Sequence, residues 1–112
     1  MKNIDSDSEL LFSVPLDHAC YADHFPGNPL VPGALLLKWI LAQIEHEFHC
    51  KVRLLKSVKF LAPVKPGDNL QIIMNTNLLK MPLSFDIYVL NTLVIKGSIE
   101  CENCAPFQRD QQ

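Results

Sequence analysis

Apolar residues occur along the chain in runs whose spacing predicts one helix and several strands. Residues 9–16 (ELLFSVPL) hold enough bulky side chains for a first strand. From Pro32-Gly33 to about His49 the chain is rich in strong helix formers, which predicts one long helix. Runs rich in Val, Ile, Leu and Phe then predict strands at 51–62, 69–79, 83–91 and 93–102. Residues 63–68, 80–82 and 91–92 are typical of the turns between them.

The order of these elements predicts the fold class. The first three turns of the helix are apolar on nearly every side, so we expect other elements to wrap it. One strand, a loop, a helix and four successive antiparallel strands indicate an α+β domain whose sheet folds around the helix. A chain of 112 residues with 48% apolar residues fits a single domain over 1–112, with a folded part at about 9–102 and polar ends.

Composition and charge exclude several classes of function. Ten Lys and Arg against twelve Asp and Glu give a net charge of −2, which argues against a general nucleic-acid binder. The most apolar window, Ala34 to Ile44, is far shorter than the roughly 20 residues that cross a bilayer, so we expect no membrane span. The polar N-terminus lacks a secretory signal pattern, and the four cysteines are then expected to be reduced thiols. These features predict a cytoplasmic protein.

The segment from His24 to Gly33 combines a titratable imidazole with a path that three prolines make rigid. Amides in a first helical turn lack intrahelical acceptors and lie at the positive end of the helix dipole. The amides of Gly33 and Ala34 are therefore able to polarise a carbonyl, and a base beside them suits proton abstraction α to a thioester. The alternative for His24 is a loop histidine that is hydrogen-bonded to the backbone.

The pattern H-F-P-G-x-P-x-x-P-G over 24–33 resembles the active-site loop of the 3-hydroxyacyl-acyl carrier protein dehydratases, hot-dog fold enzymes of fatty acid and polyketide-type synthesis. A second stretch, KFLAPVKPGD at 59–68, is similar to the strand and turn after the helix in that family. The resemblance covers about Leu16 to Cys101. It implies the hot-dog fold, His24 as the catalytic base, Gly33 as amide donor to the thioester carbonyl, a dimer, and no metal or redox cofactor.

The resemblance fails at the position of the family's second catalytic group. Five residues after the glycine the family has a carboxylic acid, and this chain has Lys38; Ala42 replaces a common glutamine, with Gln43 beside it. Trp39 is more similar to the small dehydratase-like proteins of aryl polyene clusters. Lys38 either assists the leaving hydroxyl as an acid after desolvation, or extends its ammonium to solvent or to Glu45, or marks a degenerate site.

Other candidate groups carry weaker signals. Cys101 and Cys104 have the spacing of half a zinc site, but no second pair completes four ligands. His46, His49 and Cys50 share a helical face and are interpreted as a helix end, so no metal site is predicted. Cys20 and Asp23 flank the His24 loop and receive no catalytic role.

The segment from Lys51 to Lys65 holds five basic residues and no acid. It is either the solvated face of a strand or a docking surface for an acidic acyl carrier protein.

The sequence thus predicts a protein that acts on an acyl thioester of acyl carrier protein or coenzyme A. The expected reaction removes water from a (3R)-hydroxyacyl chain and leaves a trans-2-enoyl chain, with His24, Gly33 and Lys38 as the site residues. Two alternatives stay open. One is a hot-dog thioesterase, and the other is a non-catalytic subunit that completes a related hot-dog partner in a heterodimer instead of forming a homodimer.

Overall fold

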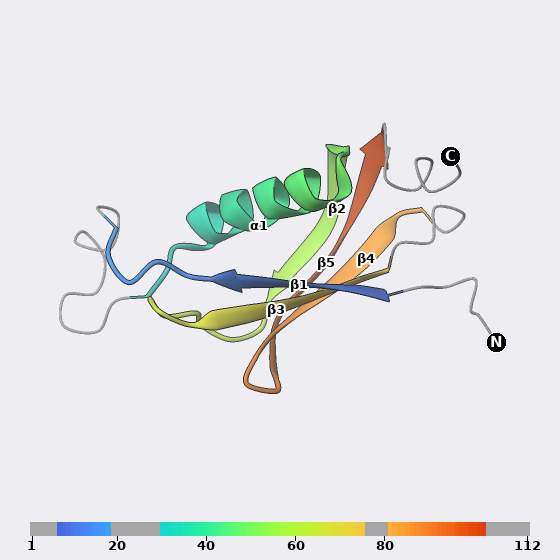
Figure 1. The fold of residues 1–112 in the computed structure, drawn as a ribbon. Coiled ribbons are helices and arrows are strands. Elements are labelled where there is room, and N and C mark those ends of the chain that lie inside the picture. The colour runs from blue at the N-terminus through green and yellow to red at the C-terminus, as the bar shows by residue number, and fades with distance from the viewer. Residues whose placement is uncertain (1–6, 19–29, 76–80, 103–112) are drawn as a thin grey trace.

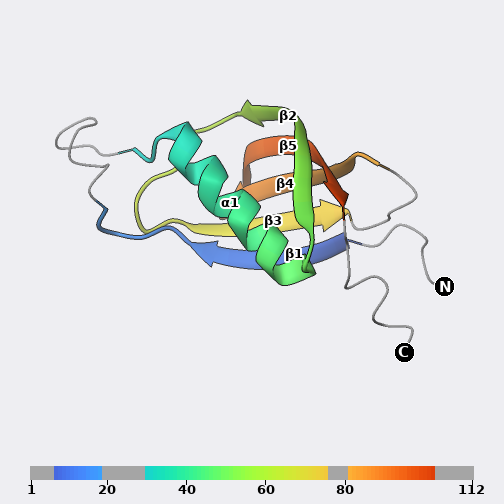
Figure 2. The same cartoon turned by 90° about the horizontal axis from the view of Figure 1, so that it is seen from above.

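The computed structural model describes residues 7–18, 30–75 and 81–102. Within these residues the chain forms β1 (Asp7–Ser13), α1 (Gly33–Phe48), β2 (Lys51–Phe60), β3 (Asn69–Asn75), β4 (Leu83–Val89) and β5 (Thr92–Glu102). The strands make one antiparallel sheet in the order β1-β3-β4-β5-β2 (Figure 1). The helix lies on one face of this sheet and runs across its strands (Figure 2). The predicted fold class, an antiparallel sheet with one long helix, is confirmed.

The ends of α1 follow from local backbone chemistry. Pro32, with φ at −59°, precedes the first helical residue, and its carbonyl accepts the Leu36 N–H at 3.0 Å. His49 ends the helix in the left-handed conformation, with φ at 50°, and the Cys50 N–H then donates to the Glu45 carbonyl at 3.3 Å. The observed helix therefore differs from the predicted one by a single residue.

Within the described residues, α1 is buried on one face only. The residues of α1 that are buried against the sheet recur every four positions and are Leu36, Ile40 and Ile44. The residues on the opposite face of the helix are exposed, and they are Ala34, Lys38 and Ala42. The sequence predicts burial on nearly every side, but the described part of this chain covers only the side that faces its own sheet.

The inner face of the sheet supplies the rest of the core. Side chains alternate along β3 and β4, as pleated strands require, so every second residue packs toward α1. The buried residues of these two strands are Leu70, Ile72, Met74, Leu83, Phe85 and Ile87. These buried residues form the face of the sheet on which the first turn of α1 rests.

Strand β2 is an edge strand with two bulges. Its pairing with β5 skips Arg53 and Lys56, each of which is an extra residue opposite a continuous partner strand. Its half-buried residues, Val52, Leu55 and Val58, consequently recur every third position instead of every second. Bulges and charged side chains limit uncontrolled pairing at a sheet edge.

Several predicted strand boundaries differ from the structure; β2 ends at Phe60 instead of residue 62, and β4 ends at Val89 instead of residue 91. The first strand was expected at 9–16, but β1 ends at Ser13. Pro15 has no N–H for a ladder, and Val14 instead bonds the turn between β2 and β3, through Asp68 O at 2.9 Å and the Gly67 N–H at 3.0 Å. The strand expected at 69–79 is described only to Asn75, because 76–80 lie outside the described residues.

Within the described residues, no helix is both long and apolar enough to cross a membrane.

Candidate functional site

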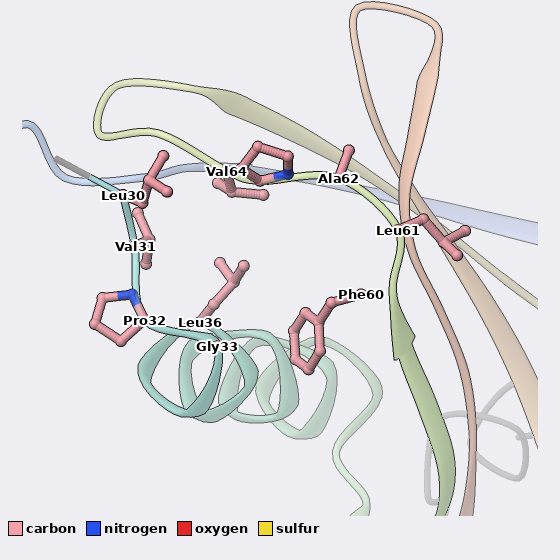
Figure 3. Close-up of a pocket in the computed structure, with 10 residues that line it drawn as sticks. Leu30, Val31, Pro32, Gly33, Leu36, Phe60, Leu61, Ala62 and Val64 are labelled. Carbon is pink, nitrogen blue, oxygen red and sulfur yellow. The ribbon is translucent and has the colours of Figure 1, made fainter. Parts of the chain in front are cut away.

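A pocket of about 430 Å³ opens at the N-terminus of α1, between the segment that leads into the helix and the segment that follows β2 (Figure 3). The residues that line it are Leu30, Val31, Pro32, Gly33, Leu36, Phe60, Leu61, Ala62, Pro63 and Val64. Not one of these side chains carries a charge or a hydrogen-bonding group. The described walls of the pocket therefore suit an apolar chain, and the polar groups that they offer are those of the backbone.

Backbone hydrogen bonds hold the two walls of the pocket together. The Val31 N–H donates to the Val64 carbonyl at 2.9 Å, which joins the two segments that resemble the dehydratase motifs. The Leu61 N–H donates to the Val94 carbonyl at 2.7 Å. Val94 is an extra residue in the pairing of β5 with β4, so a bulge turns its carbonyl toward the pocket wall.

Gly33 lies where the helix meets the pocket. A Cβ atom at this position would lie 3.3 Å from Cζ of Phe60, so the ring of Phe60 packs directly over the glycine. The N-cap residue Pro32 provides no side-chain hydrogen bond, and the first turn contains no acidic residue. Among the described residues, no acceptor bonds the amides of Gly33 or Ala34. These amides remain available for a ligand oxygen.

Lys38 does not line this pocket. It lies two residues after Leu36 and two residues before Ile40, so it is about 160° around the helix from both of these buried residues. Its side chain is exposed, and within the described part of the chain it makes no ion pair. The Glu45 carboxylate, which the sequence suggested as a partner for the Lys38 ammonium, instead accepts the Val52 N–H at 2.8 Å.

His24 lies outside the described residues, as do Cys20 and Asp23. The two ends of the segment that carries His24 are nevertheless placed. Before it, the His18 ring meets Trp39 edge-on, with ring centroids 5.4 Å apart. After it, Val31 bonds the pocket wall. Both ends therefore lie beside the first two turns of α1.

Trp39 packs on two rings. Its second aromatic contact is with Phe12 of β1, at a centroid separation of 6.0 Å. Trp39 thus connects β1 and the start of the His24 segment to the helix. In the sequence, Trp39 stands out only because this position is similar to that of the small aryl polyene proteins, and neither spacing nor composition signals that His18 lies against it.

The residues considered for a metal are placed as follows. His46 and His49 are exposed near the C-terminal end of α1, and Cys104 lies outside the described residues. In the part of the chain that the structure describes, no three His, Cys, Asp or Glu side chains gather closely enough to hold a metal ion. Cys50 and Cys101, however, lie 3.6 Å apart at their sulfur atoms, a pairing that sequence analysis missed.

Comparisons with known proteins agree with the resemblance seen in the sequence. A family model described as ApeI-like, ApeI dehydratase, matches residues 1–98. The 3-hydroxyacyl-[acyl-carrier-protein] dehydratase FabZ of Haemophilus influenzae is 28% identical over an alignment of 101 residues, which covers 80% of this chain and 66% of that protein. The chain therefore spans slightly less than two thirds of the length of this curated relative.

Two solved structures show the same fold. A protein from Erwinia carotovora subsp. atroseptica superposes with a TM-score of 0.71 at 24% identity, covering 91% of this chain and 87% of that one. The dehydratase heterocomplex ApeI:P from Xenorhabdus doucetiae gives a TM-score of 0.64 at 24% identity, with 90% and 98% covered. These similarities establish the hot-dog fold for the described elements.

Proposed function

Because this chain belongs to the ApeI-like dehydratase family, we propose that it removes water from a (3R)-hydroxyacyl thioester held by acyl carrier protein, leaving a trans-2-enoyl thioester. The observation that carries the proposal is the pocket at the start of α1. Its apolar walls suit an acyl chain, and the unbonded amide of Gly33 lies at its edge, where a thioester carbonyl needs a donor.

The proposed reaction divides three tasks among three residues. The Gly33 amide donates to the carbonyl oxygen and stabilises the negative charge that develops there. His24 takes the α-proton, so the Cα–H bond breaks as the double bond forms. The bond from Cβ to the hydroxyl oxygen then breaks, and the hydroxyl leaves as water after it gains a proton. Lys38 is the candidate that assists this departure, directly or through water.

The position of Lys38 supports the proposal of a second chain. No described segment of this chain covers the outer face of α1, on which Lys38 lies. Because Lys38 faces away from the pocket of its own chain, we propose that a second hot-dog subunit lies on this face, and that each site combines the His24 loop of one subunit with the helix of the other. The subunit is either a second copy of this chain or a related chain. The ApeI:P structure is, by its description, a heterocomplex.

A second candidate function is favoured by the same residue. If the lysine disables the acid step, the chain serves as the non-catalytic subunit of a dehydratase heterodimer and supports a catalytic partner. Such a subunit would still supply a fold, an interface and the apolar pocket. The two candidates differ in whether this chain, alone, removes water from any substrate.

We propose that β2 and the turn that follows it form the docking surface for the carrier protein. All five basic residues of the segment 51–65 are exposed, and Arg53 pairs with Glu100. Within the described residues, Lys51, Lys56 and Lys59 make no ion pair. Exposed cations without partners attract an acidic carrier. We propose that this encounter takes place in the cytoplasm.

One experiment separates the candidate functions. The purified chain is incubated with a panel of 3-hydroxyacyl chains on acyl carrier protein and on coenzyme A, and the products are weighed by mass spectrometry. Loss of one water is the expected result. Loss of the acyl group with release of a thiol would replace the dehydratase proposal with a thioesterase. Inactivity alone, with faster dehydration when a catalytic homologue is added, would identify the partner subunit.

A further inference from the structure

Two cysteines that are distant in the sequence meet at the end of the molecule opposite the pocket. Cys50 lies between the helix cap and β2, and Cys101 is the penultimate residue of β5. The two Sγ atoms are 3.6 Å apart and both residues are half-buried. The 16 residues of α1 separate this corner from Gly33 by about 24 Å along the helix axis.

The backbone on both sides of the pair is held by hydrogen bonds. Cys101 pairs with Val52 in the β2–β5 ladder and packs against the hydrophobic core. Glu45 fixes the other side twice, because its carbonyl accepts the Cys50 N–H at 3.3 Å and its carboxylate accepts the Val52 N–H at 2.8 Å. The approach of the two sulfurs is thus set by the fold and not by flexible side chains at a surface.

The geometry is close to that of a disulfide. An S–S bond is about 2.05 Å long, so the two sulfurs must approach by roughly 1.5 Å, a distance within reach of small side-chain rotations. The bond would enclose a long stretch, because the two cysteines are 51 positions apart. It would tie the end of the helix to the end of β5.

We propose that Cys50 and Cys101 form a modification site that small oxidising disulfides convert into an intramolecular disulfide. One thiolate attacks a sulfur of the oxidant, such as oxidised glutathione, and displaces one glutathione thiolate. The second protein thiolate then attacks the mixed disulfide and displaces the other. Two protein thiols are oxidised and the oxidant is reduced to two thiols. The proposal does not depend on the proposed dehydratase activity, because the pair lies at the other end of α1.

The test treats the folded full chain with oxidised glutathione, blocks remaining thiols with an alkylating reagent, and maps the linked peptides by mass spectrometry. We expect the chain to lose two hydrogens and to yield a Cys50–Cys101 linked peptide. The double variant Cys20→Ser with Cys104→Ser retains only this pair and should react in the same way. Cys50→Ser is the matched control, and it should stop at a mixed disulfide or link elsewhere.

Denaturant supplies the second control. Unfolding separates Cys50 from Cys101, so the link between Cys101 and its neighbour Cys104 should then dominate. If the folded chain instead links Cys101 to Cys104, forms only interchain disulfides, or accumulates glutathione adducts on Cys50 and Cys101, the proposal is wrong. Because the peptide map is made on the unsubstituted chain, this result does not depend on how well a variant folds.

Discussion

Replacing Lys38 with glutamate tests whether the chemistry of the family survives in this chain. The substitution should barely affect folding, because the side chain is exposed on the face of α1 opposite the core. Its neighbours one turn away are Ala34 and Ala42, so no ion pair is gained or lost along the helix. Lysine and glutamate have similar helix propensities, and we expect a change in unfolding free energy within about 0.5 kcal/mol. A change in activity will therefore report chemistry.

We expect Lys38→Glu to raise dehydratase turnover. The variant restores a carboxylic acid five residues after Gly33, about 7.5 Å along the helix axis, where the family carries its acid. A positioned acid or base typically contributes 10²- to 10⁴-fold to a rate, so a severalfold gain is the least that a working carboxylate should give, with about 10²-fold within reach.

The assay follows formation of the enoyl thioester by mass spectrometry under single-turnover conditions, with circular dichroism as the check on folding. Lys38→Gln is the matched control, because it removes the ammonium but supplies no acid, and its rate should stay below that of the glutamate variant. A clear loss of activity in Lys38→Glu, with folding unchanged, would contradict the reasoning. Lys38 would then be a catalytic acid.

Three further outcomes are expected. His24→Ala should abolish dehydration while circular dichroism stays unchanged, because a loop imidazole contributes more to chemistry than to packing; turnover at the unsubstituted rate would remove His24 from the mechanism. Light scattering at micromolar concentration should give at least twice the 12.7 kDa chain mass, alone or with a related subunit, and a persistent monomer in both cases would refute the dimer. In urea unfolding, Gly97→Ala should cost about 1–3 kcal/mol, because its Cβ would lie 2.6 Å from Cζ of buried Phe85. The control Gly33→Ala should cost less, because it meets the 48% exposed ring of Phe60 at 3.3 Å; equal losses would show that the predicted clash is relieved.

The helix, the starts of β2, β3 and β4 and the end of β5 were predictable because local signals specify them. Pro32 marks the start of α1, and a run of strong helix formers extends to its left-handed cap at His49. The residues of β2 are different. Its burial repeats every third position because bulges at Arg53 and Lys56 shift the phase, and a bulge depends on the pairing with β5 and not on the sequence of β2 alone.

The candidate site was predictable in part for the same reason. The two motif segments that resemble the dehydratases do meet, at the bond between Val31 and Val64, and Gly33 lies in the pocket that they form. The proximity of Cys50 to Cys101 was not predictable, because it follows from the register of two strands that are distant in the sequence. His24 stays a prediction, since it lies outside the described residues.

The first three turns of α1 are apolar on nearly every side, but the described chain covers only one of these sides. Leu36 and Ile40 face the sheet, which accounts for one side of the helix. The other side, around Lys38, has no cover among the described residues, yet it is nearly as apolar in sequence. A second subunit laid on this side would bury alanines readily, but it would also take an ammonium group out of water, which is costly unless an anionic or polar partner meets it. In a symmetric homodimer two Lys38 ammonium groups would be buried. In a heterodimer only one would be buried, and the partner chain could supply the missing carboxylate. Lys38, the residue that departs from the family pattern, therefore affects both the choice of subunit partner and the chemistry of the site.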